Sequence, residues 1–226
     1  MGQQQNPSKR ECVHLIILYG GTFDPIHNGH LAVANAAQST FQSDIIFLPS
    51  ADPPHRPPTS ADANQRAEMV ELAIAGHASF SCDRRELQRG GPSYSLLSLQ
   101  EWRLEAGPEQ SIAWLIGMDA FLGLPSWHAW QRLFELSHFI VADRPGHNVQ
   151  EISGELAKVC ENRWTNDSMV LNQYPAGKVF RLNLPLRDES STAIRGAFAS
   201  NRQMNTSLPD AVADYIKRNR LYPSGV

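Results

Sequence analysis

One short stretch of the chain passes from apolar to glycine-rich and then to helical character. Residues 15–31 read LIILYGGTFDPIHNGHL, so a run of strand length ends at Gly20 and Gly21, and His27 and His30 follow. Glycine lets the backbone approach an anion closely and take φ values that are closed to other residues. A helix that opens near Asn28 points its free N–H groups and the positive end of its dipole at the same place. The stretch therefore predicts a strand, a phosphate-binding turn and a helix.

The two histidines of this stretch are three residues apart, and such residues share one face of a helix. Both rings can therefore reach one oxyanion. Two alternatives are a turn with incidental histidines and a metal site. Asp24 is the only acidic or thiol side chain nearby at ligand spacing, whereas a protein zinc site usually takes three or four protein ligands. We therefore expect no metal-ligand residue in this motif.

The composition is that of an ordinary globular protein. The chain has 226 residues, of which 42% are hydrophobic and 19% charged, enough for one domain with a substantial core. A net charge of −3 argues against a general nucleic-acid binder, which needs clustered basic surface. No apolar run approaches the roughly 20 residues of a membrane span, and residues 1–10 lack the apolar core of a signal peptide. We expect a cytoplasmic protein without nucleic-acid or membrane partners, and leave homo-oligomer formation open.

The cysteines give no sign of a disulfide framework or a redox motif. Cys12, Cys82 and Cys160 lie far apart and show no C-x-x-C spacing. We expect reduced thiols without a part in chemistry.

Apolar runs and amphipathic segments alternate along most of the chain. This pattern is typical of βαβ units and predicts a Rossmann-like, doubly wound α/β fold, with a mainly parallel sheet and helices on both faces. Ligands then bind beyond the carboxyl ends of the strands. The expected strands are residues 15–19, 44–48, 79–82, 112–116, 139–141 and 179–182. The expected helices are residues 31–38, 64–75, 94–105, 130–136, 151–160 and 193–199.

Three loops that follow expected strands carry polar or glycine residues: residues 20–21, 117–119 and 188–192. We expect them to converge at one edge of the sheet. Residues 49–58 contain five prolines, four of them between Pro53 and Pro58. We interpret this segment as a stiff loop that holds His55 and Arg56, with a surface linker as the alternative. Residues 160–177 are read as an irregular connection that carries Trp164 into a core or a site.

The opening stretch resembles the T/H-x-G-H nucleotidyltransferase superfamily, and GGTFDPxHxGHL is the form found in its nicotinate mononucleotide adenylyltransferases. Residues 190–195 read SSTAIR. Hydroxyls at a helix start are commonly caps, but SSTxIR is similar to the second signature of this family, which favours a phosphate site. Further similar segments are PPHR at 53–56, GPSYS at 91–95, IGMD at 116–119, PSW at 125–127, RPG at 144–146 and RLY at 220–222. Arginine replaces the family's usual lysine in the first of these, serine its threonine in the second, and Arg220 its glycine in the last.

The resemblance implies transfer of AMP from ATP to nicotinate mononucleotide in NAD biosynthesis, which gives deamido-NAD and pyrophosphate. It also implies Mg²⁺ held mainly by the ATP phosphates, without protein metal ligands. We expect residues 1–13 to be a flexible tail and residues 14–226 to be a single nucleotidyltransferase domain with a small C-terminal helical portion.

The resemblance also implies the site residues. His27, His30 and Arg195 are the implied catalytic residues. The implied ATP-binding residues are Gly20, Gly21, Thr22, Phe23, His27, His30, Ser191, Thr192 and Arg195. The implied acceptor-binding residues are Arg56, Ser93, Tyr94, Ser95, Asp119, Trp127 and Arg144.

Each acceptor residue has an implied part in binding. Asp119 faces the ribose hydroxyls, Trp127 is the platform for the pyridine ring, and backbone N–H groups of residues 93–95 face the nicotinate carboxylate. Arg56 and Arg144 bind or steer the mononucleotide phosphate, and solvated surface positions are the alternative for both. A core position is the alternative for Trp127, although Trp130 fits a core position better.

Other functions stay open at this point. A related transferase could use nicotinamide mononucleotide or phosphopantetheine, and a non-catalytic nucleotide sensor could be built on the same fold. A tRNA synthetase also has an H-x-G-H motif, but this chain is too short to include an anticodon-reading domain. A panel of acceptors with ATP separates the transferases, and turnover separates an enzyme from a sensor.

Overall fold

A computed structural model describes the chain except for residues 1–13, 52–58, 144–151, 185–188, 201–206 and 224–226. Its centre is a seven-stranded sheet in the order β3-β2-β1-β4-β5-β7-β6, in which all neighbouring strands are parallel. The strands are β1 (Ile16–Gly21), β2 (Ile45–Pro49), β3 (Phe80–Cys82), β4 (Ile112–Gly117), β5 (His138–Asp143), β6 (Trp164–Thr165) and β7 (Val179–Asn183). All six expected strands are present.

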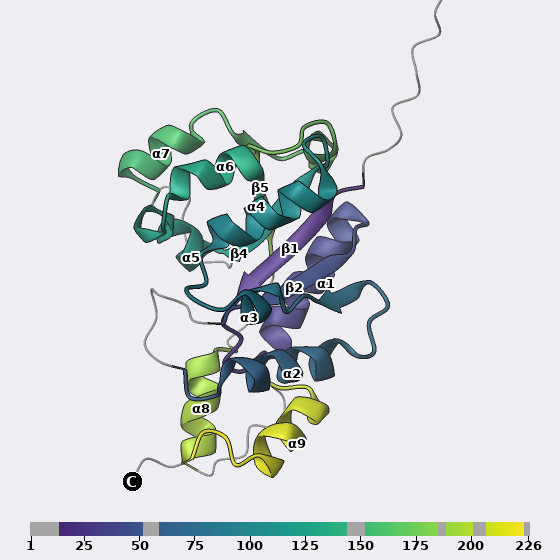
Figure 1. The fold of residues 1–226 in the computed structure, drawn as a ribbon, viewed down its shortest axis with the longest axis vertical. Helices are drawn as coiled ribbons and strands as arrows, with labels where there is room; N and C mark the ends of the chain where they lie inside the picture. The colour runs from purple at the N-terminus through teal and green to yellow at the C-terminus, as the bar shows by residue number, and fades with distance from the viewer. Residues whose placement is uncertain (1–13, 52–58, 144–151, 185–188, 201–206, 224–226) are drawn as a thin grey trace, which may run out of the picture.

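The helices alternate with the strands along the chain (Figure 1). They are α1 (Asn28–Phe41), α2 (Ala63–Ile74), α3 (Arg85–Arg89), α4 (Ser95–Ala106), α5 (Met118–Leu122), α6 (Leu133–Leu136), α7 (Gly154–Cys160), α8 (Ser191–Ala199) and α9 (Asp210–Arg218). Short 3-10 turns lie at Leu124–Ser126, Trp130–Arg132 and Ser168–Asn172. Among the described residues, no helix is both long and apolar enough to cross a membrane.

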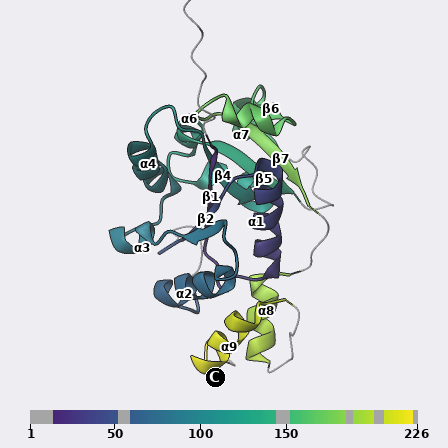
Figure 2. The same cartoon turned by 90° about the vertical axis from the view of Figure 1, so that its right-hand side faces the viewer.

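The sheet separates two hydrophobic layers. Successive residues of a strand point to opposite faces, so in β1 Ile17 and Tyr19 join one buried cluster and Leu18 joins the other. Helices α1, α2, α8 and α9 contribute to the first cluster, and α4, α6 and α7 to the second (Figures 1 and 2). This arrangement confirms the Rossmann-like α/β fold with helices on both faces.

The strand order places a switch point between β1 and β4. From β1 the chain winds outward to β2 and β3, and it then returns to the other side of β1 for β4 and β5. The loops that follow β1 and β4 therefore diverge, which leaves a crevice at the carboxyl ends of these two central strands. Ligands of open α/β sheets bind at such points.

Residues 160–177 are more regular than expected. They contain β6, whose Trp164 pairs with Val179 of β7, and a 3-10 turn that carries the fully buried Leu171. The Trp164 ring contacts Phe121 edge to face, with 5.9 Å between ring centroids. Of the two destinations left open for Trp164, the structure supports the core.

Candidate active site

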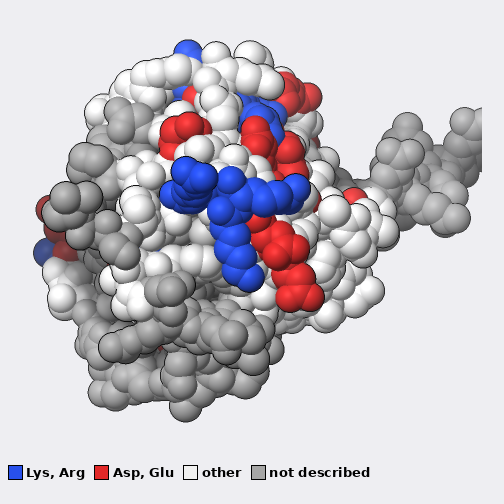
Figure 3. Space-filling model, turned by 90° about the horizontal axis from the view of Figure 1, so that it is seen from below, with Lys and Arg blue, Asp and Glu red and all other residues white. Residues whose placement is uncertain are grey.

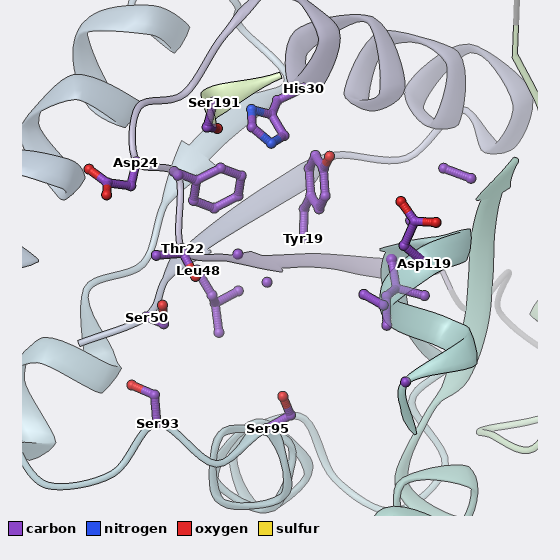
Figure 4. Close-up of a pocket in the computed structure, with 18 of the residues that line it drawn as sticks. Tyr19, Thr22, Asp24, His30, Leu48, Ser50, Ser93, Ser95, Asp119 and Ser191 are labelled. Atoms are coloured by element: carbon purple, nitrogen blue, oxygen red, sulfur yellow. The ribbon is translucent and has the colours of Figure 1, made fainter. Parts of the chain in front are cut away.

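A cavity of about 860 Å³ opens at the switch point. Its walls include residues 19–24 at the end of β1 and in the loop beyond it, residues 116–120 at the end of β4 and the start of α5, and residues 189–192 at the start of α8. The three loops predicted to converge at one edge of the sheet therefore do so within the described residues. Figure 4 shows His30 and Ser191 on one side of this cavity and Ser93 and Ser95 on the opposite side.

The two histidines lie against each other at the start of α1. His27 is buried and has extended backbone angles just before the helix, and His30 lies in the first turn. Their rings stack with 3.7 Å between centroids. The predicted proximity is confirmed, but its cause differs: His27 is the N-cap residue, so the two side chains do not share a helical face.

A hydrogen bond sets the tautomer of His30 when its ring is neutral. The backbone N–H of His27 donates to Nδ1 of His30 at 3.2 Å. A neutral imidazole that accepts at Nδ1 carries its proton on Nε2. His30 therefore offers one N–H donor while the other ring nitrogen holds the turn.

The two glycines serve close packing, and the explanation by φ was wrong for them. Gly20 and Gly21 end β1 and are not among the glycines with positive φ. A Cβ atom on Gly20 would lie 2.2 Å from the Trp114 ring, and one on Gly21 would lie 2.8 Å from the Phe23 ring. The left-handed conformation falls on Phe23 instead, with φ 48°. Its ring packs edge to face on His30, with 5.2 Å between centroids.

The second signature docks onto the loop that carries the first. Ser191 Oγ donates to the Pro25 carbonyl at 3.1 Å, and Arg195 Nη1 donates to the Asp24 carbonyl at 2.7 Å. Arg195 Nη2 also donates to Thr192 Oγ1 at 3.3 Å. Residues about 170 positions apart in sequence thus form one wall of the cavity.

The start of α8 combines a helix cap with side chains that line the cavity. Ser190 is the N-cap of α8, because its Oγ accepts from the Ala193 N–H at 3.2 Å. Ser191, Thr192 and Arg195 line the cavity next to the first turn of α8. Free N–H groups at such a helix start attract anions.

Asp24 is the centre of a buried network behind this wall. One carboxylate oxygen accepts from the Tyr222 hydroxyl at 2.7 Å and the other from the Ser60 N–H at 3.2 Å. Arg195 lies 3.9 Å from the second oxygen. Burial, followed by the bond to Asp24, raises the pKa of Tyr222. The network thus connects Tyr222, near the end of the chain, to the loop after β1.

The opposite wall is the start of α4. Ser93, Tyr94 and Ser95 line the cavity, and the Tyr94 N–H donates back to the Pro92 carbonyl at 3.0 Å. The N–H groups of Ser95 and Leu96 lie in the first turn of α4, where a helix has no partners of its own for such groups. A carboxylate at this wall would therefore meet the helix N-terminus, and the Tyr94 N–H is already used.

Asp119 and Trp127 complete the cavity on the β4 side. Asp119 is exposed in the first turn of α5, and Trp127 is half-buried; both line the cavity. Trp130 is buried and its ring contacts Phe134, with 6.2 Å between centroids. The assignment of Trp127 to the site and of Trp130 to the core agrees with this geometry. Arg56 and Arg144 lie outside the described residues.

Sequence reasoning missed three residues around the cavity. His128 stacks on Tyr94 with 4.5 Å between ring centroids, and Glu86 is a buried carboxylate in the lining. Burial raises the pKa of Glu86, against the lowering effect of hydrogen bonds from Ser98 and Ser93. Arg66 is fully buried behind the lining. Glu86 and Arg66 look like the charged face of a surface helix, so no sequence signal could have identified them.

Comparisons with known proteins agree with this geometry. A family model described as cytidylyltransferase-like matches residues 18–197, so the fold and the cavity are those of a nucleotidyltransferase. A probable nicotinate-nucleotide adenylyltransferase of Stenotrophomonas maltophilia is 47% identical over 93% of this chain and 97% of its own length. One from Yersinia pestis is 42% identical over 96% of this chain and 99% of its own length. The chain belongs to the cytidylyltransferase-like family and, within it, to the nicotinate-nucleotide adenylyltransferases.

A solved structure extends the likeness of fold. The Plasmodium falciparum nicotinic acid mononucleotide adenylyltransferase, solved as a complex with NaAD, superposes with a TM-score of 0.67 over 92% of this chain and 97% of its own. Its sequence identity of 19% limits this comparison to the fold.

Proposed function

We propose that this chain transfers AMP from ATP to the 5′-phosphate of nicotinate mononucleotide, which forms deamido-NAD and releases pyrophosphate. The observation that carries the proposal is one cavity with two unlike walls, a His–His–Arg wall at α1 and α8 and a helix N-terminus with aromatic side chains at α4. The names of relatives that match nearly the whole chain support the same reaction.

The wall at α1 and α8 takes the triphosphate in this proposal. An anionic acceptor phosphate must attack an α-phosphorus that already carries negative charge, so catalysis depends on in-line positioning and on neutralising the leaving pyrophosphate. His27 and His30 face the α- and β-phosphates, with the Nε2–H of His30 as a transition-state donor. Arg195, Ser191 and Thr192 hold the β- and γ-phosphates. No side-chain nucleophile takes part.

The wall at α4 takes the nicotinate mononucleotide. The ring stacks on Trp127, the ribose hydroxyls bond Asp119, and the carboxylate meets the first-turn N–H groups of Ser95 and Leu96. Arg56 and Arg144 keep their proposed part in binding the mononucleotide phosphate.

We propose that Mg²⁺ enters with ATP and stays bound mainly to phosphate oxygens and water, which suits its preference for retained waters. Within the described ranges, no group of three or more His, Cys, Asp or Glu side chains could hold a metal ion. Asp24 lies in the loop that precedes the histidines, and one of its oxygens accepts from the Tyr222 hydroxyl while the other accepts from the Ser60 N–H. The residues present therefore fit a metal that the nucleotide carries.

Free nucleotides, and no nucleic acid, are the partners that we propose. On the face seen in Figure 3, basic and acidic side chains of the described residues lie next to one another, and the net charge of the chain is −3. A nucleic-acid site needs an excess of basic surface. We further propose a cytoplasmic location, which fits the free thiols of Cys82 and Cys160.

The test is a turnover assay with ATP, Mg²⁺ and one acceptor at a time. With nicotinate mononucleotide we expect pyrophosphate and deamido-NAD in equal amounts, measured by a coupled assay and by chromatography. Phosphopantetheine is the control acceptor and should give no pyrophosphate. Absence of turnover with nicotinate mononucleotide, or turnover with phosphopantetheine alone, would overturn the proposal.

A further inference from the structure

Arg66 of α2 is a fully buried arginine whose hydrogen-bond partners among the described residues are all backbone carbonyls. Its guanidinium donates to the Thr22 carbonyl at 2.7 Å, to the Ala51 carbonyl at 2.9 Å and to the Ala61 carbonyl at 3.3 Å. Burial lowers its pKa, and the charge of Asp24 opposes this effect. Arg66 is not among the described residues that line the cavity, so it reaches the substrates only through the backbone that it holds.

Two of the carbonyls that Arg66 joins belong to the loops after two neighbouring strands, β1 and β2. Thr22 lies in the loop after β1, which carries the histidines, and Ala51 lies just beyond the end of β2. The Ala51 N–H in turn donates to Ser93 Oγ at 2.8 Å. Figure 4 shows Thr22 and Ser93 bordering the same side of the cavity. A continuous chain of hydrogen bonds therefore runs from the phosphate wall through Arg66 and Ala51 to the α4 wall.

The far end of this chain is anchored in the protein. Ser98 of α4 donates to the buried carboxylate of Glu86 at 2.6 Å, and Ser93 also forms a hydrogen bond with Glu86. The turn before α4 is thus held by hydrogen bonds to Glu86 of α3 and to the Ala51 backbone. Movement of Ala51 would shift this turn relative to the phosphate wall.

Arg103 of α4 provides a natural comparison for Arg66. Its acceptors within the described part of the chain are likewise backbone carbonyls, among them Gly107 at 3.1 Å, Leu136 at 2.6 Å and Pro175 at 3.0 Å. Burial lowers the pKa of Arg103 as well. These carbonyls are outside the cavity lining as described, so Arg103 stabilises the fold without joining the two walls.

We propose that Arg66 is a positioning residue for the transfer reaction, which fixes the phosphate wall and the acceptor wall at the separation that in-line attack requires. The inference rests on the function proposed above. A substitution of Arg66 leaves the binding groups of each wall in place. The reaction rate therefore falls because the two bound substrates are misaligned. A misplacement of about 1 Å can cost about 10²-fold in rate, whereas separate binding of each substrate changes little.

The test compares Arg66→Lys with the matched control Arg103→Lys. Lysine keeps the positive charge, but its single ammonium group cannot reach three carbonyls in a fixed plane. We expect Arg66→Lys to lower kcat at least about 10-fold, with both KM values within about threefold of wild type. Arg103→Lys should lower the denaturation midpoint by a similar amount and leave kcat unchanged. Steady-state kinetics and urea unfolding on the same preparations give both readouts.

Three outcomes overturn the inference. One is a wild-type kcat in Arg66→Lys, the second is an equal loss of kcat in Arg103→Lys, and the third is a loss confined to the KM of one substrate. If Arg66→Lys does not fold, Ser93→Ala breaks the same chain on a half-buried turn; an unchanged kcat there overturns the inference too. Failure of the proposed function is separate, because it would appear as absence of turnover in the wild-type enzyme.

Discussion

His30 and Arg195 each serve the fold and the proposed chemistry at once. His30 accepts the His27 N–H through Nδ1, and Arg195 holds the Asp24 carbonyl, while both side chains also line the cavity. Each residue is therefore held in place by one group and offers another to the ligand. Preorganised donors of this kind need no rearrangement as charge develops in the transition state.

Removal of the His30 ring should damage turnover far more than folding. We expect His30→Ala to lower kcat by about 10²-fold or more, as loss of one transition-state donor does, and to cost about 1 kcal/mol of stability through the lost cap bond. The control is His77→Ala, since His77 stacks on Phe80 and lies outside the cavity lining. Near wild-type kcat for His30→Ala at saturating substrates would show that the assigned role is wrong.

Arg195→Lys tests the second signature. Lysine cannot hold the Asp24 carbonyl and present a planar pair of donors to a phosphate, so we expect a raised KM for ATP and a lower kcat, with a smaller change for the mononucleotide. Arg218→Lys on exposed α9 is the matched control. Unaltered kcat and KM for ATP in Arg195→Lys would show that residues 190–195 serve only as a helix cap and as a contact to the loop after β1.

At this scale the sequence predicted the residues that stand in motifs and missed those that act through the backbone. His27, His30 and Arg195 stand in two recognisable strings, and the structure brings them to one cavity. Arg66 is an arginine in an amphipathic helix, and only the tertiary structure shows that three carbonyls surround it. The conformation of Phe23 was likewise hidden, because its positive φ depends on how the loop closes.

At the scale of elements, long periodic segments were predictable and very short ones were not. The apolar runs of β1 and β4 stand out because both faces of a central parallel strand are buried. Strand β6 has two residues, too few for any periodicity, and exists because β7 lies beside it. Helices α3 and α5 have five residues each. Helix α9 carried a usable signal, with Val212 and Ile216 buried four positions apart.

The start of β5 carries a pH-sensitive contact. The buried His138 ring receives the Lys178 N–H at Nδ1 and bonds the Tyr174 carbonyl through Nε2. The bond at Nδ1 needs the neutral ring, whereas Nε2–H donates to the Tyr174 carbonyl in either state. Burial outweighs that second bond and lowers the pKa of His138 to about 4. The folded pKa is thus below the unfolded value of about 6.5, so the unfolded chain binds the proton more readily.

The free energy of unfolding should therefore fall as the pH drops. The contribution of His138 is fully present above about pH 6.5 and is lost as the pH falls towards 4, by about 3 kcal/mol in all. Urea unfolding at several pH values measures it. His138→Gln cannot titrate, so the difference between wild type and variant should shrink over this window. A pH-independent difference would contradict the assignment of His138 as a buried neutral ring.

At the scale of the whole molecule, the switch point of the sheet explains why distant segments form one site. The phosphate wall joins residues near both ends of the chain, and the acceptor wall comes from the segments around β4. The parallel order of strands was predictable, so the convergence of loops was too. The hydrogen-bond chain between the walls was not, because it depends on the exact approach of three loops to one guanidinium.

The choice between two acceptors depends on the N–H groups at the start of α4. The N–H groups at the start of α4 are donors only, so they suit the two oxygens of a nicotinate carboxylate and meet the NH₂ of nicotinamide with nothing to accept it. A donor buried against a donor costs about 1–3 kcal/mol, and loss of a charge-assisted bond adds to this. Since about 1.4 kcal/mol corresponds to a tenfold change in rate, the two effects together reach about 10²-fold.

The measurement is kcat/KM for nicotinate and for nicotinamide mononucleotide, with ATP and Mg²⁺, on the wild-type enzyme. We expect a preference for nicotinate mononucleotide of at least about 10²-fold. Trp127→Ala is the control, because loss of a stacking surface should weaken both acceptors and leave their ratio nearly unchanged. Comparable efficiencies for the two mononucleotides in the wild type would contradict the assignment of the α4 wall to the carboxylate.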